Sequence, residues 1–207
     1  MHVLRVICLL AILVAAPAAR SEEPAAATPS AAIDALHAQL LDVMKHAKEL
    51  GYAGREQKLR TVIPRYFDVD EMARKSLGAP QWKAASEDAK QRYLATFERF
   101  MVANYAGRFD GFSGQSFETL GEVPGTRDTV IVKTRLLDPT DKNVTLNYQM
   151  HRAGSDWKVI DVYLDGTVSE LALRRSEFVS IVKRENLDAL LVALDAKIAK
   201  LAAGGES

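Results

Sequence analysis

The spacing of apolar residues along this 207-residue chain changes twice. Between about residue 30 and residue 110 they recur every three or four positions, which predicts amphipathic helices. Between residues 115 and 164 they recur at every second position, which predicts strands. After Gly166 the helical spacing returns, with helices predicted over 168–184 and 187–201. Helices followed by a run of strands and then more helices are typical of an α+β fold.

The most distinctive helix is predicted from Tyr93 to Phe112. Its large apolar side chains lie three or four residues apart and therefore share one face. These side chains are Tyr93, Phe97, Phe100, Met101, Tyr105 and Phe109. Such a broad aromatic face needs a large apolar partner, and the strands that follow are the expected one. The same spacing suits a solid core and the lining of a ligand cavity, so both interpretations stay open.

Three shorter helices are predicted before this one, over Ser30–Gly51, Glu56–Phe67 and Val69–Leu77. Ser30 is the expected N-cap of the first helix, and Gly51 is expected to end it. Pro64 should kink the second helix because proline lacks a backbone donor and clashes with the preceding turn. Asp68 is the expected cap of the third helix. Trp82 then begins a linker, and the long aromatic helix is capped by Ser86.

Four strands are predicted, over residues 115–123, 129–137, 144–152 and 157–164. The turns between the later strands are short, so these strands should pair as antiparallel neighbours. We therefore expect a curled antiparallel sheet of about four strands packed against long helices. This arrangement is similar to the sheet of nuclear transport factor 2 with a helical annex.

The N-terminus has the pattern of a secretory signal. An apolar run over Val6–Ala16 has the length of a signal-peptide core, and Ala16-Pro17-Ala18 is a small-residue cleavage site. We assign residues 1–20 to a signal peptide and expect the mature protein in the periplasm, with an uncleaved membrane anchor as the alternative. Residues 21–32, rich in Ala, Pro and Ser, are predicted to be a flexible leader. Residues 33–203 then form a single domain.

Composition excludes several classes of function. The 27 basic and 27 acidic residues balance, whereas a nucleic-acid-binding protein normally carries a basic surface. Cys8, the only cysteine, lies within the predicted signal, so the mature chain has no thiolate nucleophile. His37 and His46 are nine residues apart and cannot share a helix face as metal ligands do. No sequence motif of a hydrolase, a zinc enzyme or a phosphate-binding loop is present. We expect no enzyme activity, no cofactor and no metal.

Two polar features leave alternatives open. Asp161 lies on the same strand face as Trp157, and a carboxyl inside an apolar pocket could serve as the base of a small enzyme. The structural alternative is that Asp161 pairs with an arginine or caps a backbone group. Arg174 and Arg175 could meet a lipid phosphate or an acidic partner. They are equally consistent with a solvated helix face.

Several segments together resemble the MlaC, or toluene-tolerance, family. These segments are Phe67–Gly78 followed by Trp82, Asn104–Phe109, Trp157–Val162, Gly166–Ser169, Arg175–Phe178 and Leu187–Leu191. None is catalytic or unique by itself, but their order covers the chain from about Leu36 to Leu201. The resemblance implies a soluble periplasmic carrier that takes part in lipid transport and in outer-membrane lipid asymmetry. It would pass a phospholipid between an outer-membrane lipoprotein complex and an inner-membrane ABC transporter complex.

The resemblance also implies a deep pocket between sheet and helices that holds the acyl tails. The expected lining residues are Phe97, Phe100, Met101, Tyr105, Val132, Leu146, Tyr148 and Val159. Two segments, Tyr52–Arg55 and Ile63–Asp68, are more similar to the hopanoid-associated branch of the family (HpnM), whose cargo would be a hopanoid. Three classes therefore compete: a lipid carrier, a small enzyme that uses Asp161, and an interaction scaffold with a solid core.

Overall fold

The computed structural model describes residues 28–204, which fold into helices and one antiparallel sheet. The helices are α1 (Pro29–Lys45), α2 (Ala47–Tyr66), α3 (Val69–Leu77), α4 (Ala79–Ala84), α5 (Glu87–Arg108), α6 (Glu170–Arg184) and α7 (Leu187–Ala202). The strands are β1 (Ser116–Pro124), β2 (Val130–Leu137), β3 (Val144–Ala153), β4 (Asp156–Leu164) and β5 (Val168–Ser169). The predicted α+β class is confirmed. The predicted signal peptide lies outside the described residues.

The first two helices differ in detail from the prediction. Thr28, and not Ser30, caps α1, and its side chain accepts a hydrogen bond from the backbone of Ala31. Ser30 instead donates to the Glu122 carboxylate of β1, which ties the start of the helix to the sheet. The helix therefore begins at Pro29, inside the range that the sequence assigned to the leader.

The sequence predicted a kink at Pro64, but the residue of α2 with non-helical dihedral angles is Gly51 and not Pro64. The positive φ of 57° at Gly51 is one that glycine adopts without strain. The helix passes through Pro64 and ends only two residues later, at Tyr66. The break predicted at Gly51 is confirmed, but regular helix surrounds it on both sides.

The caps predicted for the next helices are confirmed. Asp68 accepts a hydrogen bond from the Glu71 N–H at the start of α3, and Ser86 does the same for Ala89 in α5. Trp82 was expected in a linker, but it lies in the short helix α4. The long aromatic helix is displaced toward the N-terminus relative to the prediction, because it ends at Arg108 and leaves Phe112 exposed beyond it.

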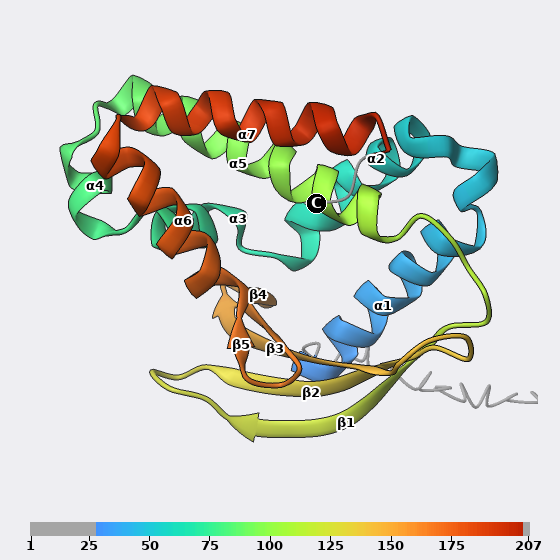
Figure 1. Cartoon of the computed structure of the whole chain (residues 1–207). Helices are drawn as coiled ribbons and strands as arrows, with labels where there is room; N and C mark the ends of the chain where they lie inside the picture. The colour runs from blue at the N-terminus through green and yellow to red at the C-terminus, as the bar shows by residue number, and fades with distance from the viewer. Residues whose placement is uncertain (1–27, 205–207) are drawn as a thin grey trace, which may run out of the picture.

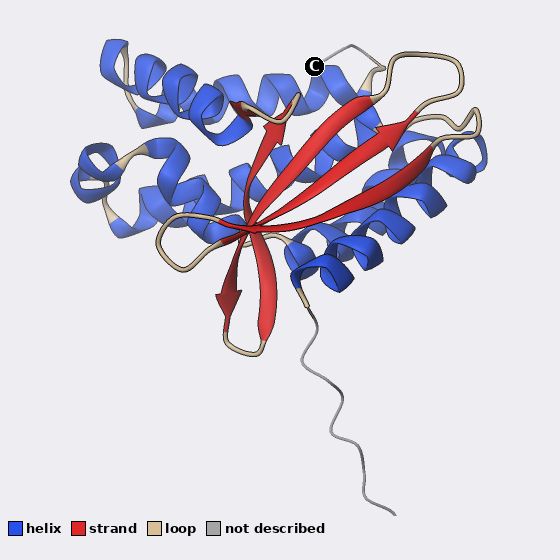
Figure 2. Cartoon of the chain, turned by 90° about the horizontal axis from the view of Figure 1, so that it is seen from below, coloured by secondary structure: helices blue, strands red, loops and turns tan. Residues whose placement is uncertain are grey.

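The sheet has the strand order β1-β2-β3-β4-β5, with each strand antiparallel to the next along the chain. The fifth strand has two residues and was not predicted. Register irregularities at Thr119/Gly121 and at Gln149/Met150 accompany the strong twist of the strands, which fan apart in Figure 2. The twist opens space between the sheet and the helices that cover it.

The helices lie on one side of the sheet (Figure 1). Helix α1 crosses the sheet directly, whereas α5 and α7 run side by side in a layer farther from the strands. Helix α5 packs mainly on α2, α3 and α7, so the expectation that the strands are its main partner was wrong. Only its C-terminal end approaches the sheet across an open space, and this space is the candidate site.

Candidate functional site

The candidate site is a cavity of about 460 Å³ between the C-terminal end of α5 and one end of strands β2, β3 and β4. Its apolar lining consists of Met44, Tyr105, Phe109, Leu136, Val144, Leu146, Tyr148, Val162 and Leu164. The strand residues come together because Leu136 pairs with Val144 and Leu146 pairs with Leu164. Alternation along the strands turns these side chains toward the helices, so three strands and two helices contribute to one apolar surface.

Charged and polar groups lie around this surface and are mostly paired with one another. Arg108 at the end of α5 donates to the Glu170 carboxylate of α6 at 2.7 Å. Gln115 donates to Asp138 at 2.8 Å. Within each pair, the two groups satisfy each other's charge or hydrogen-bonding capacity. These polar groups lie at the boundary of the cavity, and its interior is apolar.

Tyr148 lines the cavity, and behind it lies the buried His37 of α1. The tyrosine hydroxyl lies 3.1 Å from Nε2 of the imidazole, which also stacks on the Phe117 ring with centroids 3.8 Å apart. Burial lowers the pKa of His37 to about 4, against a smaller opposing effect of Asp34. The imidazole is therefore neutral at pH 7. Burial also raises the pKa of Tyr148, so its phenol presents no charge to the cavity.

Tyr105 separates the main cavity from a narrower hollow of about 20 Å³ toward α3 and α6. Its ring packs edge-on against Phe67 and stacks on Phe109, with centroids 5.4 and 5.6 Å apart. Burial raises the pKa of Tyr105 well above its ordinary value, so the phenol is neutral. Both hollows also share Val162 and the paired side chains of Arg108 and Glu170. The two hollows therefore adjoin each other at Tyr105.

The eight lining residues expected from the sequence fall into four groups. Tyr105, Leu146 and Tyr148 line the main cavity. Phe97 and Met101 line the narrow hollow together with Tyr105. Phe100 lines a third hollow between α5, α6 and α7. Val132 and Val159 have no exposed surface and belong to the core of the sheet.

Other lining residues were not singled out from the sequence, although the signal was present. Leu136 follows Val132 and Thr134 on the same face of β2, and Val144 precedes Leu146 and Tyr148 on β3. Alternation could have found both. Met44 could not have been found in this way, because the sequence does not show that the end of α1 reaches the cavity.

Asp161, the candidate catalytic base, has a structural environment. Its carboxylate accepts hydrogen bonds from the Ser169 hydroxyl and from the backbone N–H groups of Val162 and Leu171. It lines none of the three hollows. The cap interpretation therefore holds, although the partners are backbone and hydroxyl groups and include no arginine.

Within residues 28–204, no group of three or more histidine, cysteine, aspartate or glutamate side chains is placed to hold a metal ion. The helices of this part of the chain are also too short or too polar to span a membrane. The polar groups near the cavity therefore form no recognisable metal centre, and the apolar space remains the main feature of the site.

Comparisons with known proteins agree with this geometry. The structure is similar to that of a phospholipid-binding protein from Ralstonia solanacearum, solved in complex with a phospholipid. The TM-score is 0.69 at 21% identity, and the match covers 83% of this chain and 97% of the other. No sequence match was found among curated proteins. The family model described as MlaC protein matches residues 34–196, which is most of the chain. The chain therefore belongs to the MlaC family.

Proposed function

We propose that this protein is a phospholipid carrier that holds acyl tails in the cavity between α5 and the sheet. The observation that carries the proposal is the apolar part of the lining of this cavity, from Tyr105 across Leu146 to Tyr148. The family membership and the phospholipid bound to the similar Ralstonia protein support the choice of cargo. No group in the lining offers a covalent or metal-mediated attachment, as suits a carrier that must release its cargo unchanged.

The energetics of burial are consistent with this role. Each methylene removed from water contributes about 0.8 kcal/mol, so a tail of about fifteen methylenes would gain about 12 kcal/mol before the costs of binding. The main cavity of about 460 Å³ is within the range of roughly 300–1,000 Å³ found for small-molecule sites. Two complete tails need more room than this, and displacement of the Tyr105 ring from between the cavity and the narrow hollow is one way to extend the space.

The proposal includes the route of transport. The carrier would move through the periplasm between an outer-membrane lipoprotein complex and an inner-membrane ABC transporter complex. Export would depend on the predicted signal peptide over residues 1–20, and energy would come from the partner transporter. A hopanoid is the alternative cargo, and its rigid ring system would need a wider cavity than flexible tails do.

Native mass spectrometry of the mature protein purified from periplasm, followed by lipid extraction, tests the proposal. A stoichiometric diacyl phospholipid adduct is the expected result. A hopanoid adduct would support the carrier function but identify a hopanoid, and not a phospholipid, as the cargo. A folded protein that contains no lipid, and that takes up none from phospholipid vesicles, would overturn the proposal.

A further inference from the structure

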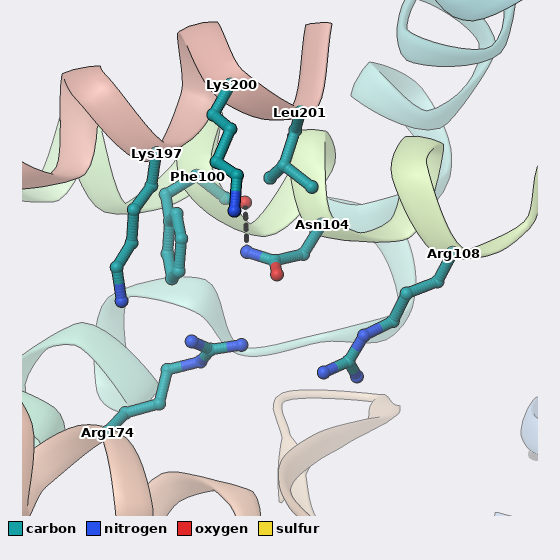
Figure 3. Close-up of a pocket in the computed structure, with 7 residues that line it drawn as sticks. All are labelled: Phe100, Asn104, Arg108, Arg174, Lys197, Lys200 and Leu201. Atoms are coloured by element: carbon teal, nitrogen blue, oxygen red, sulfur yellow. Dashed lines mark hydrogen bonds between the residues drawn. The ribbon is translucent and has the colours of Figure 1, made fainter. Parts of the chain in front are cut away.

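Cationic side chains from three helices meet at a hollow beside the proposed lipid cavity. The hollow has a volume of about 300 Å³ and is lined by Phe100, Asn104, Arg108, Arg174, Lys197, Lys200 and Leu201. Figure 3 shows the guanidinium groups of Arg108 and Arg174 reaching toward the same space from α5 and α6, while Lys200 points toward it from α7. No carboxylate belongs to this lining.

Two of these cations are balanced by neighbouring acids and two are not. Arg108 pairs with Glu170 at 2.7 Å, and Lys197 pairs with Glu177. Within residues 28–204, neither Arg174 nor Lys200 makes an ion pair or a side-chain hydrogen bond. The hollow therefore carries an excess of positive charge that this part of the chain does not neutralise.

Arg174 is partly buried and makes no ion pair with the acids near it in residues 28–204. Burial lowers the pKa of its guanidinium, and the like charge of Arg108 lowers it further, against the opposing effects of nearby acids. Its guanidinium carbon lies 4.6 Å from the centre of the Phe100 ring, an attraction that favours the charged form. A partly buried arginine without a carboxylate partner is expected where a ligand supplies the negative charge.

The hollow adjoins the narrow hollow, with which it shares lining residues. Asn104, Arg108 and Arg174 also line the narrow hollow, which Tyr105 separates from the main cavity. A ligand could therefore place an anionic group among the cations and extend apolar tails past Tyr105. Arginine suits a phosphate group because its planar donors can bind two oxygens, and lysine adds a compact charge.

We propose that Arg174 and Lys200, assisted by Arg108, bind a phosphate group, namely that of the lipid whose tails occupy the cavity. The inference rests on the proposed carrier function and adds selection of the cargo to it. A lipid with a phosphate would be bound in preference to a neutral lipid with the same tails. The lipid would also have a defined orientation, with its phosphate between α5, α6 and α7.

The test compares two lipids that differ only in the phosphate-containing headgroup. Delipidated protein is titrated with a fluorescent phosphatidylglycerol and with a diacylglycerol that carries the same labelled chains. We expect Arg174→Gln and Lys200→Gln each to weaken phosphatidylglycerol binding by about tenfold or more and to leave diacylglycerol binding within about twofold. Arg175→Gln is the matched control, because Arg175 is the next residue on α6, is exposed and lines none of the three hollows. Unchanged phosphatidylglycerol affinity in Arg174→Gln would overturn the proposal.

A second titration distinguishes a site for a lipid headgroup from a site for free phosphate. It also tests the carrier function and the phosphate site independently. Inorganic phosphate should compete with phosphatidylglycerol for the wild type and have no effect on diacylglycerol. If inorganic phosphate binds while no lipid does, the carrier function fails and the site is one for free phosphate. If neither binds, both proposals fail. Circular dichroism checks that each variant is folded, and Arg174→Lys should retain part of the affinity because it keeps the charge and loses the planar donors.

Discussion

The Asp161 carboxylate accepts a 2.6 Å hydrogen bond from the Ser169 hydroxyl and thereby joins β4 to the start of α6. The same carboxylate accepts the Leu171 N–H at 3.1 Å. Burial raises the pKa of Asp161, while its hydrogen bonds act in the opposite direction by stabilising the charged form. Helix α6 also carries Glu170 and Arg174, so this carboxylate helps to position the charged groups beside the cavity.

Asp161→Asn should destabilise the protein by about 1–3 kcal/mol, because an amide nitrogen in place of Oδ2 cannot accept the hydrogen bond from the Ser169 hydroxyl. Urea unfolding monitored by circular dichroism measures the loss. Ser169→Ala should also destabilise, because Ser169 both donates to Asp161 and caps α6 through the Ala172 N–H. Since the two residues share one bond, the double variant should lose less than the sum of the single losses. A midpoint for Asp161→Asn equal to that of the wild type would contradict this structural role.

Local features of the fold were predictable because they depend on neighbouring residues. The side chains of Asp68 and Ser86 each cap the helix that the sequence assigned to them. The partner of a helix face was not predictable in this way. Phe97 and Phe100 both pack against Phe178 of α6, whereas strands were the partner predicted for this helix face. Periodicity shows which side chains turn inward, but it does not show which element they meet.

The position of the cavity could not be predicted from the sequence for the same reason. Val132 and Leu146 both lie on inward-facing positions of neighbouring strands, yet Val132 is core and Leu146 lines the cavity. The difference is their place along the sheet, because the lining pairs Leu136–Val144 and Leu146–Leu164 lie toward one end. Only the twist of the sheet and the distance of α5 from it decide where the space opens.

Leu146→Trp should reduce phospholipid occupancy severalfold, because an indole at this position occupies part of the cavity of about 460 Å³. Occupancy is measured by native mass spectrometry after incubation with phospholipid vesicles. Leu120→Trp is the control, since Leu120 lies on β1, is 46% exposed and lines none of the three hollows. Full occupancy in a folded Leu146→Trp protein would place the tails elsewhere.

His37 should make the stability of the protein depend on pH. Its pKa is about 4 in the folded state and about 6.5 when unfolded, so the unfolded chain binds more protons between these values. Above about pH 6.5 the titration of His37 has almost no effect on the free energy of unfolding. As the pH falls from about 6.5 toward 4, the free energy of unfolding decreases. The loss should reach about 2 kcal/mol at pH 5. Urea unfolding between pH 7.5 and about pH 5 measures it.

His37→Phe is the informative variant for this pH dependence. It keeps a ring to stack on Phe117 and removes the titrating group, so its stability should change less over the same range. It should be less stable than the wild type at pH 7, because the Tyr148 hydroxyl loses its partner. His46→Gln, at an exposed site, should retain the acid-induced loss of the wild type. An equal loss in His37→Phe would assign the pH dependence to other groups.

Arg174→Met should make the lipid-free protein more stable, although the residue contributes to the proposed phosphate site. Methionine fills a similar length beside Phe100 and removes a partly buried charge that has no acidic partner within residues 28–204. The gain should be up to about 1 kcal/mol, or about 2–4 °C in the melting temperature. Adding phosphatidylglycerol should reverse the order, because the wild type binds it more tightly and gains more stability from it. Arg175→Met should change neither value. A lipid-free Arg174→Met protein that melts below the wild type would show that the charge stabilises the fold, and the excess of positive charge would then need no ligand to explain it.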